Sequence, residues 1–225
     1  MTRVVVVVEG ECELRLVKEA IAPAIDRPGL RVEAHSVQTG IRSRTGGAAK
    51  GGGGWPPLLA QLERELGSPS AVVTTLFDLY RFSWPSGKTG GATAEAAEAA
   101  MRQALSERAP HAVARFYPYV QRHEFETYAF VDLDALKARL PPSDHRALAA
   151  LAASVSGFSP EDIDGGRATA PSRRLATLPS LAVTSSWKLS LVWPAIAEIG
   201  LPRIRAACPR FDGWLRWMED LDPTR

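Results

Sequence analysis

The segment Val4-Val5-Val6-Val7-Val8-Glu9-Gly10 decides the fold of this chain. Its unbroken run of β-branched residues shows no polar alternation, which is typical of a strand that is covered on both faces in a parallel sheet. Glu9 and Gly10 end the run, and apolar residues then recur at helical spacing over residues 13–24. This order of strand and helix predicts that the run is a central strand of an α/β domain.

The same alternation continues along the first half of the chain. We expect strands over 31–37 and 71–77, helices over 55–66 and 93–108, and a β segment over 112–119. Strands that alternate with helices predict a mostly parallel sheet with flanking helices. The functional sites of such folds lie at the carboxyl ends of the strands.

The second half of the chain is expected to be mainly helical. The predicted features are a helix over 133–140 capped by Asp132, a helix start at 159–162, a polar loop over 164–180, and amphipathic helices over 188–199 and 211–221. We therefore divide the chain into an α/β core, residues 1–131, and a helical C-terminal extension packed on that core, residues 132–225.

Composition excludes several classes of protein. With 45% hydrophobic and 23% charged residues, the chain differs from disordered and disulfide-scaffold proteins. Cys12 and Cys208 lie too far apart for a metal-finger spacing, and the longest apolar run, residues 4–8, is too short to span a membrane. These features predict a cytoplasmic protein that does not bind membranes. The net charge of +2 identifies no partner.

Acidic residues follow the first and third predicted strands. Glu9 and Glu13 come directly after the valine run, Glu11 between them is expected to face solvent, and Asp78 follows the third strand. Carboxylates that meet at strand ends supply the oxygen ligands that Mg²⁺ or Mn²⁺ requires. For Glu13 the alternative is that an acidic residue in the first turn of a helix stabilises the helix dipole.

Several further motifs occur in a fixed order along the chain. They are Val8-Glu9-Gly10, Asp78-Leu79-Tyr80 with Pro85 and Gly87, the segment Pro118 to Glu126, the segment Ala170 to Leu175, and Ile199-Gly200-Leu201 leading to Arg205, Cys208-Pro209 and Phe211. Together they resemble the bacterial Toprim-like family called domain of unknown function 4276. The core of that family is similar to the Toprim domains of topoisomerases, primases and overcoming-lysogenization-defect nucleases.

The resemblance implies a Mg²⁺-dependent nuclease that cleaves phosphodiester bonds in DNA or RNA. It implies that Glu9 acts as general acid or base and that Asp78 binds the metal. It also implies a role in phage defence, together with a partner ATPase of the ABC or overcoming-lysogenization type. The resemblance is compatible with a homo-oligomer. Tyr80 stands where Toprim proteins have a second metal-binding Asp, and a phenol is a poor Mg²⁺ ligand. The alternative is a catalytically silent binding or regulatory subunit.

The segment His123-Glu124-Phe125-Glu126 could supply the missing metal ligand. In an extended chain Glu124 and Glu126 would face the same way, whereas on a helix they would diverge by about 200°. A zinc-protease motif is excluded because Thr127 occupies the position of its second histidine. A histidine at the edge of the core is the alternative role for His123.

Cations elsewhere in the chain are candidates for contacts with phosphate. Arg173 and Arg174 could bind a nucleic-acid backbone, with Lys188 as a further catalytic cation, although a solvated loop with a structural salt bridge remains the alternative.

Gly87-Lys88-Thr89 matches the tail of a nucleotide-binding P-loop, which would make the protein an NTPase or kinase. Phe82 stands where that motif needs a glycine, so the P-loop is disfavoured. Lys88 remains a candidate phosphate contact.

Overall fold

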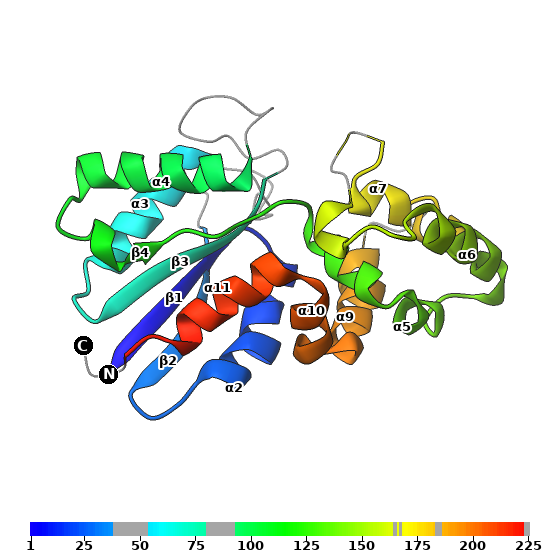
Figure 1. Ribbon diagram of the computed structural model, residues 1–225, viewed down its shortest axis with the longest axis horizontal. Helices are drawn as coiled ribbons and strands as arrows, with labels where there is room; N and C mark the ends of the chain where they lie inside the picture. Colours follow the sequence, from blue (N-terminus) through cyan, green and yellow to red (C-terminus); the bar gives the residue numbers. More distant parts are fainter. Residues whose placement is uncertain (38–53, 80–92, 164–165, 167, 183–185, 223–225) are drawn as a thin grey trace, which may run out of the picture. The chain divides into compact units, whose positions relative to one another are not determined.

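The structure is a computed structural model that describes residues 1–37, 54–79, 93–163, 166, 168–182 and 186–222. The chain forms two compact units (Figure 1), the first from residues 1–121 and 217–225 and the second from residues 122–216. The domain boundary at residues 131 and 132 stays a prediction. Within the described part of the chain, no helix has both the length and the apolar character needed to cross a lipid bilayer.

The first unit is built on a five-stranded parallel sheet. Its strands are β1 (Thr2–Val8), β2 (Leu30–Ser36), β3 (Ala71–Asp78), β4 (Phe116–Tyr117) and β5 (Val120–Gln121). The order is β2-β1-β3-β4, and β5 also pairs with β3. The central strand predicted from the valine run is confirmed, because β1 lies between two neighbours and all its valines are fully buried.

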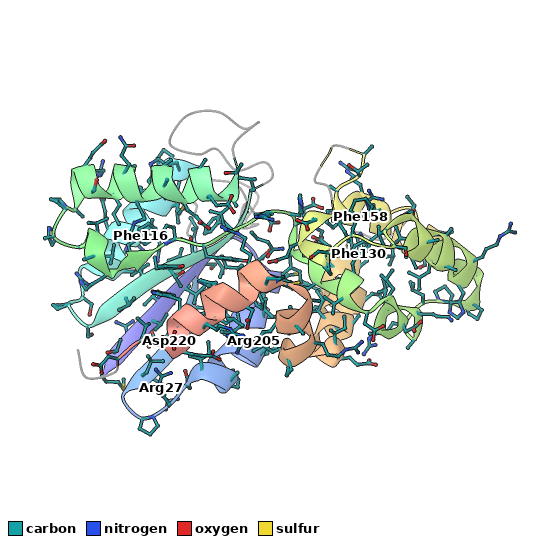
Figure 2. All side chains as sticks on the ribbon, viewed as in Figure 1. Arg27, Phe116, Phe130, Phe158, Arg205 and Asp220 are labelled. Atoms are coloured by element: carbon teal, nitrogen blue, oxygen red, sulfur yellow. The ribbon has the colours of Figure 1, made fainter. Side chains whose placement is uncertain are left out.

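Helices cover both faces of this sheet. They are α1 (Glu11–Arg15), the π-helix η1 (Leu16–Ile21), α2 (Ala22–Ile25), α3 (Trp55–Leu66), α4 (Ala94–Arg108) and the 3-10 helix η2 (Val113–Arg115). On one face Val5, Val7 and Phe116 pack in a cluster with α3 and α4 (Figures 1 and 2). The continuous helical segment over residues 11–25 lies on the other face (Figure 1). The predicted helices over 55–66 and 93–108 are therefore confirmed.

The predicted β segment over 112–119 is confirmed only at β4. Pro118 has no N–H group to donate to a neighbouring strand, so the ladder breaks between β4 and β5. The buried Thr75 side chain of β3 fills this break. Its Oγ1 donates to the Tyr119 carbonyl at 2.9 Å and accepts from the Tyr119 N–H at 3.0 Å.

The second unit is mainly helical, as the sequence predicts. Its helices are η3 (Phe125–Val131), α5 (Leu133–Lys137), η4 (Pro142–Asp144), α6 (His145–Ser154), η5 (Pro160–Asp162), α7 (Pro171–Leu175), α8 (Pro179–Ala182), η6 (Lys188–Val192), α9 (Trp193–Ile199), α10 (Leu201–Ala207) and α11 (Pro209–Glu219), of which η6 is a π-helix and the other η segments are 3-10 helices. The last three residues of α11 belong to the first unit.

The structure bears on the predicted helix cap at Asp132 and on the predicted polar loop over 164–180. Asp132 caps α5 by accepting the Asp134 N–H at 3.0 Å, which confirms the predicted cap. The polar loop predicted over 164–180 is wrong where α7 and α8 form. Both helices begin with a proline, Pro171 and Pro179, and proline favours the first helical position because the N–H group that it lacks would have no partner there.

A buried carboxylate stabilises the start of α8. Oδ2 of Asp144 accepts hydrogen bonds from the Ser180 N–H at 3.0 Å and the Ser180 hydroxyl at 2.5 Å. The Ser180 hydroxyl is the main reason that the pKa of Asp144 lies below its ordinary value. A carboxyl whose pKa is lowered by folding stabilises the protein above its unfolded pKa of about 4, and this contribution is lost as pH falls through the folded pKa.

We therefore expect Asp144→Asn to lower the melting temperature at pH 7 and to have a progressively smaller effect below about pH 4, where the aspartate is protonated too. Thermal unfolding followed by circular dichroism between pH 3 and 7 measures this difference. A difference that stays constant across the range would contradict an ionised Asp144.

Candidate functional site

Two carboxylates follow neighbouring strands at one edge of the sheet. Glu9 comes directly after β1, and Asp78 is the last residue of β3. The two strands are parallel, and Val8 is paired with Leu76, so Glu9 and Asp78 lie just beyond the same rung of the ladder. On the other side of β3, Asp78 is paired with Gln121 of β5. The register of β1 and β3 therefore shows that these two strands end at a common edge of the sheet, as expected.

Glu13 approaches the same edge from the first turn of α1. The Glu13 side chain is buried, and a Cβ placed on Gly10 would stand only 2.6 Å from its Oε2. The carboxylate of Glu13 therefore occupies space beside Gly10 that is open only because residue 10 has no side chain. Glu11, by contrast, is exposed, and its carboxylate lies 3.5 Å from Arg15 Nε, which confirms that it faces solvent.

The chemistry of these groups fits Mg²⁺. Among the described residues, no group of three or more His, Cys, Asp or Glu side chains is placed to hold a metal ion. Mg²⁺ nevertheless is commonly bound through one or two carboxylates together with water and substrate phosphate. Glu9, Glu13 and Asp78 supply oxygen donors only, which suits this hard cation and does not suit a soft one.

The second unit contains the other two predicted metal ligands. Glu124 has an extended backbone and precedes η3, whereas Glu126 lies inside this 3-10 helix. Of the two conformations considered for this segment, Glu126 therefore has the helical one. Oε2 of Glu124 accepts the Ser172 N–H at 2.8 Å. The role of Glu124 or Glu126 as a metal ligand stays a prediction.

Glu126 forms an ion pair with Lys188 inside the second unit. Only 1% of the Glu126 side chain is exposed, and its Oε1 contacts Lys188 Nζ. Burial raises the pKa of Glu126, the Lys188 ammonium opposes that rise, and the nearby Glu124 carboxylate adds to it. Sequence reasoning named both Glu126 and Lys188 but missed their pairing.

The candidate phosphate contacts differ in their surroundings. Arg173 is exposed on α7, and Arg174 Nε donates to the Thr169 carbonyl at 2.6 Å. Arg174 therefore stabilises the turn before α7, whether or not it also contacts phosphate. Lys88 and Tyr80 lie outside the described residues, as does the whole P-loop-like segment.

Trp187 lies next to Lys188 in the sequence but is not among the predicted site residues. It is buried, and the Lys188 ammonium lies 5.7 Å from the centroid of its ring. An aromatic residue beside a candidate catalytic lysine is a signal that could have suggested this contact from the sequence.

Comparison with known proteins identifies the family of this chain. No curated protein and no solved structure matched the chain. Residues 8–219 match the family described as Domain of unknown function (DUF4276), and this match covers nearly the whole chain. The chain therefore belongs to that family.

Proposed function

We propose that this protein is a Mg²⁺-dependent or Mn²⁺-dependent enzyme that hydrolyses phosphodiester bonds in nucleic acid. The observation that supports this most is the position of Glu9 and Asp78 at adjacent carboxyl ends of β1 and β3, with buried Glu13 directed to Gly10 beside them. Sites of α/β sheets form at this edge. The resemblance of these motifs to a Toprim core agrees with that chemistry.

Each carboxylate has a distinct role in the proposal. Glu13 and Asp78 would hold the metal, which would polarise the phosphoryl oxygen as a Lewis acid. Glu9 would act as general acid or base, exchanging a proton with the attacking water or the leaving oxygen as the P–O bond breaks. Lys88, Arg173 and Arg174 are the proposed contacts for phosphate.

We also propose that the protein works in the cytoplasm with a partner ATPase, in phage defence. The chain has a net charge of only +2, so it supplies little of the long-range attraction that tight, independent binding of nucleic acid requires. A partner that binds the nucleic acid would supply the electrostatic attraction that this chain lacks.

Purified protein incubated with plasmid DNA or RNA tests the proposed activity. Cleavage that needs Mg²⁺ or Mn²⁺ and is abolished by Asp78→Asn, with an unchanged circular dichroism spectrum, would support it. Metal binding without cleavage would indicate the catalytically silent subunit. Absence of both metal binding and cleavage, with and without the partner ATPase, would refute the enzyme.

The space beside Gly10 gives a second test of the site. The backbone of Gly10 is extended, with φ −131° and ψ 177°, so alanine fits its conformation. The added Cβ would displace the Glu13 carboxylate, and we expect Gly10→Ala to weaken Mn²⁺ binding about 10- to 100-fold, as for a change beside a metal ligand. Isothermal titration calorimetry measures the affinity.

Gly213 provides the matched control. It lies within α11, and a Cβ there would meet nothing within 4 Å. Gly213→Ala is expected to leave Mn²⁺ affinity unchanged and to raise stability slightly through helix propensity. Equal Mn²⁺ affinity in the two alanine variants would argue against a metal-binding Glu13.

A further inference from the structure

The pair formed by Glu126 and Lys188 combines a deeply buried anion with an accessible cation. Glu126 lies on η3 and is 1% exposed, whereas Lys188 opens the π-helix η6 and 47% of its side chain is exposed. Both residues belong to the second unit. The lysine side chain therefore extends from solvent to a buried carboxylate.

This arrangement is an inefficient way to gain stability. A buried ion pair loses about as much hydration free energy as its attraction returns, and an apolar pair of similar volume often does better. Lys188 also begins a π-helical segment, a geometry that is rare and is frequent at functional sites. Both features favour a role in binding over a role in folding.

The position of the Lys188 ammonium is fixed from two sides. Glu126 Oε1 contacts Nζ, and the Trp187 ring centroid lies 5.7 Å from it. A lysine side chain normally samples many rotamers, and ordering it costs conformational entropy. When the ammonium is already held in place, much of this conformational entropy is lost on folding, so less is lost when a ligand binds.

We propose that Lys188, held by Glu126 and Trp187, is a preformed contact for the backbone phosphates of nucleic acid. An ammonium carries three N–H donors, so it can bind a phosphate while it keeps its contact with a carboxylate. Glu126 is then a positioning residue for Lys188 and does not bind the metal. Nucleic acid is chosen as the ligand because of the proposed function. The contact between Lys188 and phosphate contributes to the binding of nucleic acid and takes no part in its cleavage.

Fluorescence anisotropy with labelled oligonucleotides, in EDTA and over a range of NaCl concentrations, tests this contact without cleavage. One phosphate contact contributes about 0.9 to the slope of log affinity against log salt on duplex DNA, or about eightfold in affinity at 0.1 M salt. We expect Lys188→Gln to lower affinity and slope by these amounts. Lys137→Gln, a change at an exposed lysine of the same unit, is expected to have no effect.

Glu126→Gln separates positioning from simple charge. Removing a negative charge near a phosphate site should strengthen binding by electrostatics alone. If Glu126 positions Lys188, binding should instead weaken several-fold, with Mn²⁺ affinity unchanged. Tighter binding of nucleic acid, or a loss of Mn²⁺ affinity with an unchanged salt slope, overturns the proposal.

The double variant Glu126→Gln/Lys188→Gln keeps the test valid if either single variant unfolds. It replaces the ion pair by two neutral amides and leaves no buried charge. Relative to wild type it should lose about eightfold in affinity and about 0.9 in salt slope, the loss expected for Lys188→Gln alone, because a positioning residue has no effect once its partner is gone. Losses that add in the double variant overturn the proposal. So does wild-type protein that binds neither single-stranded nor duplex probe, with and without the partner ATPase. Metal-dependent cleavage is measured separately and decides the proposed function.

Discussion

Glu9→Gln is expected to lower the rate of metal-dependent phosphodiester cleavage by about 10²- to 10⁴-fold, the usual contribution of a general acid or base. Glutamine keeps the size and shape of the side chain but cannot exchange the proton. Glu9 follows β1, a strand that is fully buried from Val4 to Val8, so its backbone is held in place independently of its side chain. Single-turnover cleavage at saturating Mn²⁺ measures the chemical step.

Glu11→Gln is the matched control. Glu11 is two residues away, but it is exposed and its charge partner is Arg15 on the same helix. Its replacement should change the rate less than twofold, because exposed ion pairs of this kind contribute little. Comparable losses for Glu9→Gln and Glu11→Gln would contradict a catalytic Glu9 and would point to a general electrostatic effect.

Glu161→Ala is expected to destabilise the protein by about 2–4 kcal/mol. The buried Glu161 carboxylate accepts the N–H groups of Arg210 and Phe211, each at 2.9 Å, at the first turn of α11. Alanine leaves both N–H groups without this acceptor, and an unsatisfied buried group costs about 1–3 kcal/mol. Urea unfolding followed by tryptophan fluorescence measures the loss.

The neighbouring Asp162 gives the control for this effect. Its Oδ1 lies 3.2 Å from Arg122 Nη1, and both side chains are exposed. Asp162→Asn should therefore change stability by less than about 1 kcal/mol. If the two variants lost similar stability, Glu161 would not be acting through the N–H groups of α11.

Local sequence patterns were sufficient for much of the α/β unit. The valine run predicts a strand with neighbours on both sides because nothing in it is polar, and β1 has this position. The ends of β1 and β3 could also be predicted from the sequence, because Glu9 and Asp78 are the first charged residues after apolar runs. Local patterns failed at β4 and β5, where the Thr75 side chain replaces the ladder that Pro118 interrupts.

The candidate site in the second unit was less accessible to sequence reasoning. Glu126 and Lys188 are far apart in the chain, and no local pattern indicates that they pair. The sequence left the backbone around Glu124 open between extended and helical, because the 3-10 turn that follows it depends on packing within the unit. Tertiary contacts also explain how the C-terminal residues join the first unit, where Arg27 donates to the carbonyls of Glu219 and Leu221, each at 2.7 Å.

Under the proposed function, Glu9, Glu13 and Asp78 belong to one metal-dependent site at the carboxyl edge of the sheet. Anomalous scattering from a crystal soaked in Mn²⁺ tests it most directly. We predict an anomalous peak within about 2.0–2.3 Å of carboxylate oxygens of Asp78 and Glu13. A well-ordered soaked crystal with no peak at this edge, or with Mn²⁺ bound only elsewhere, would contradict the claim.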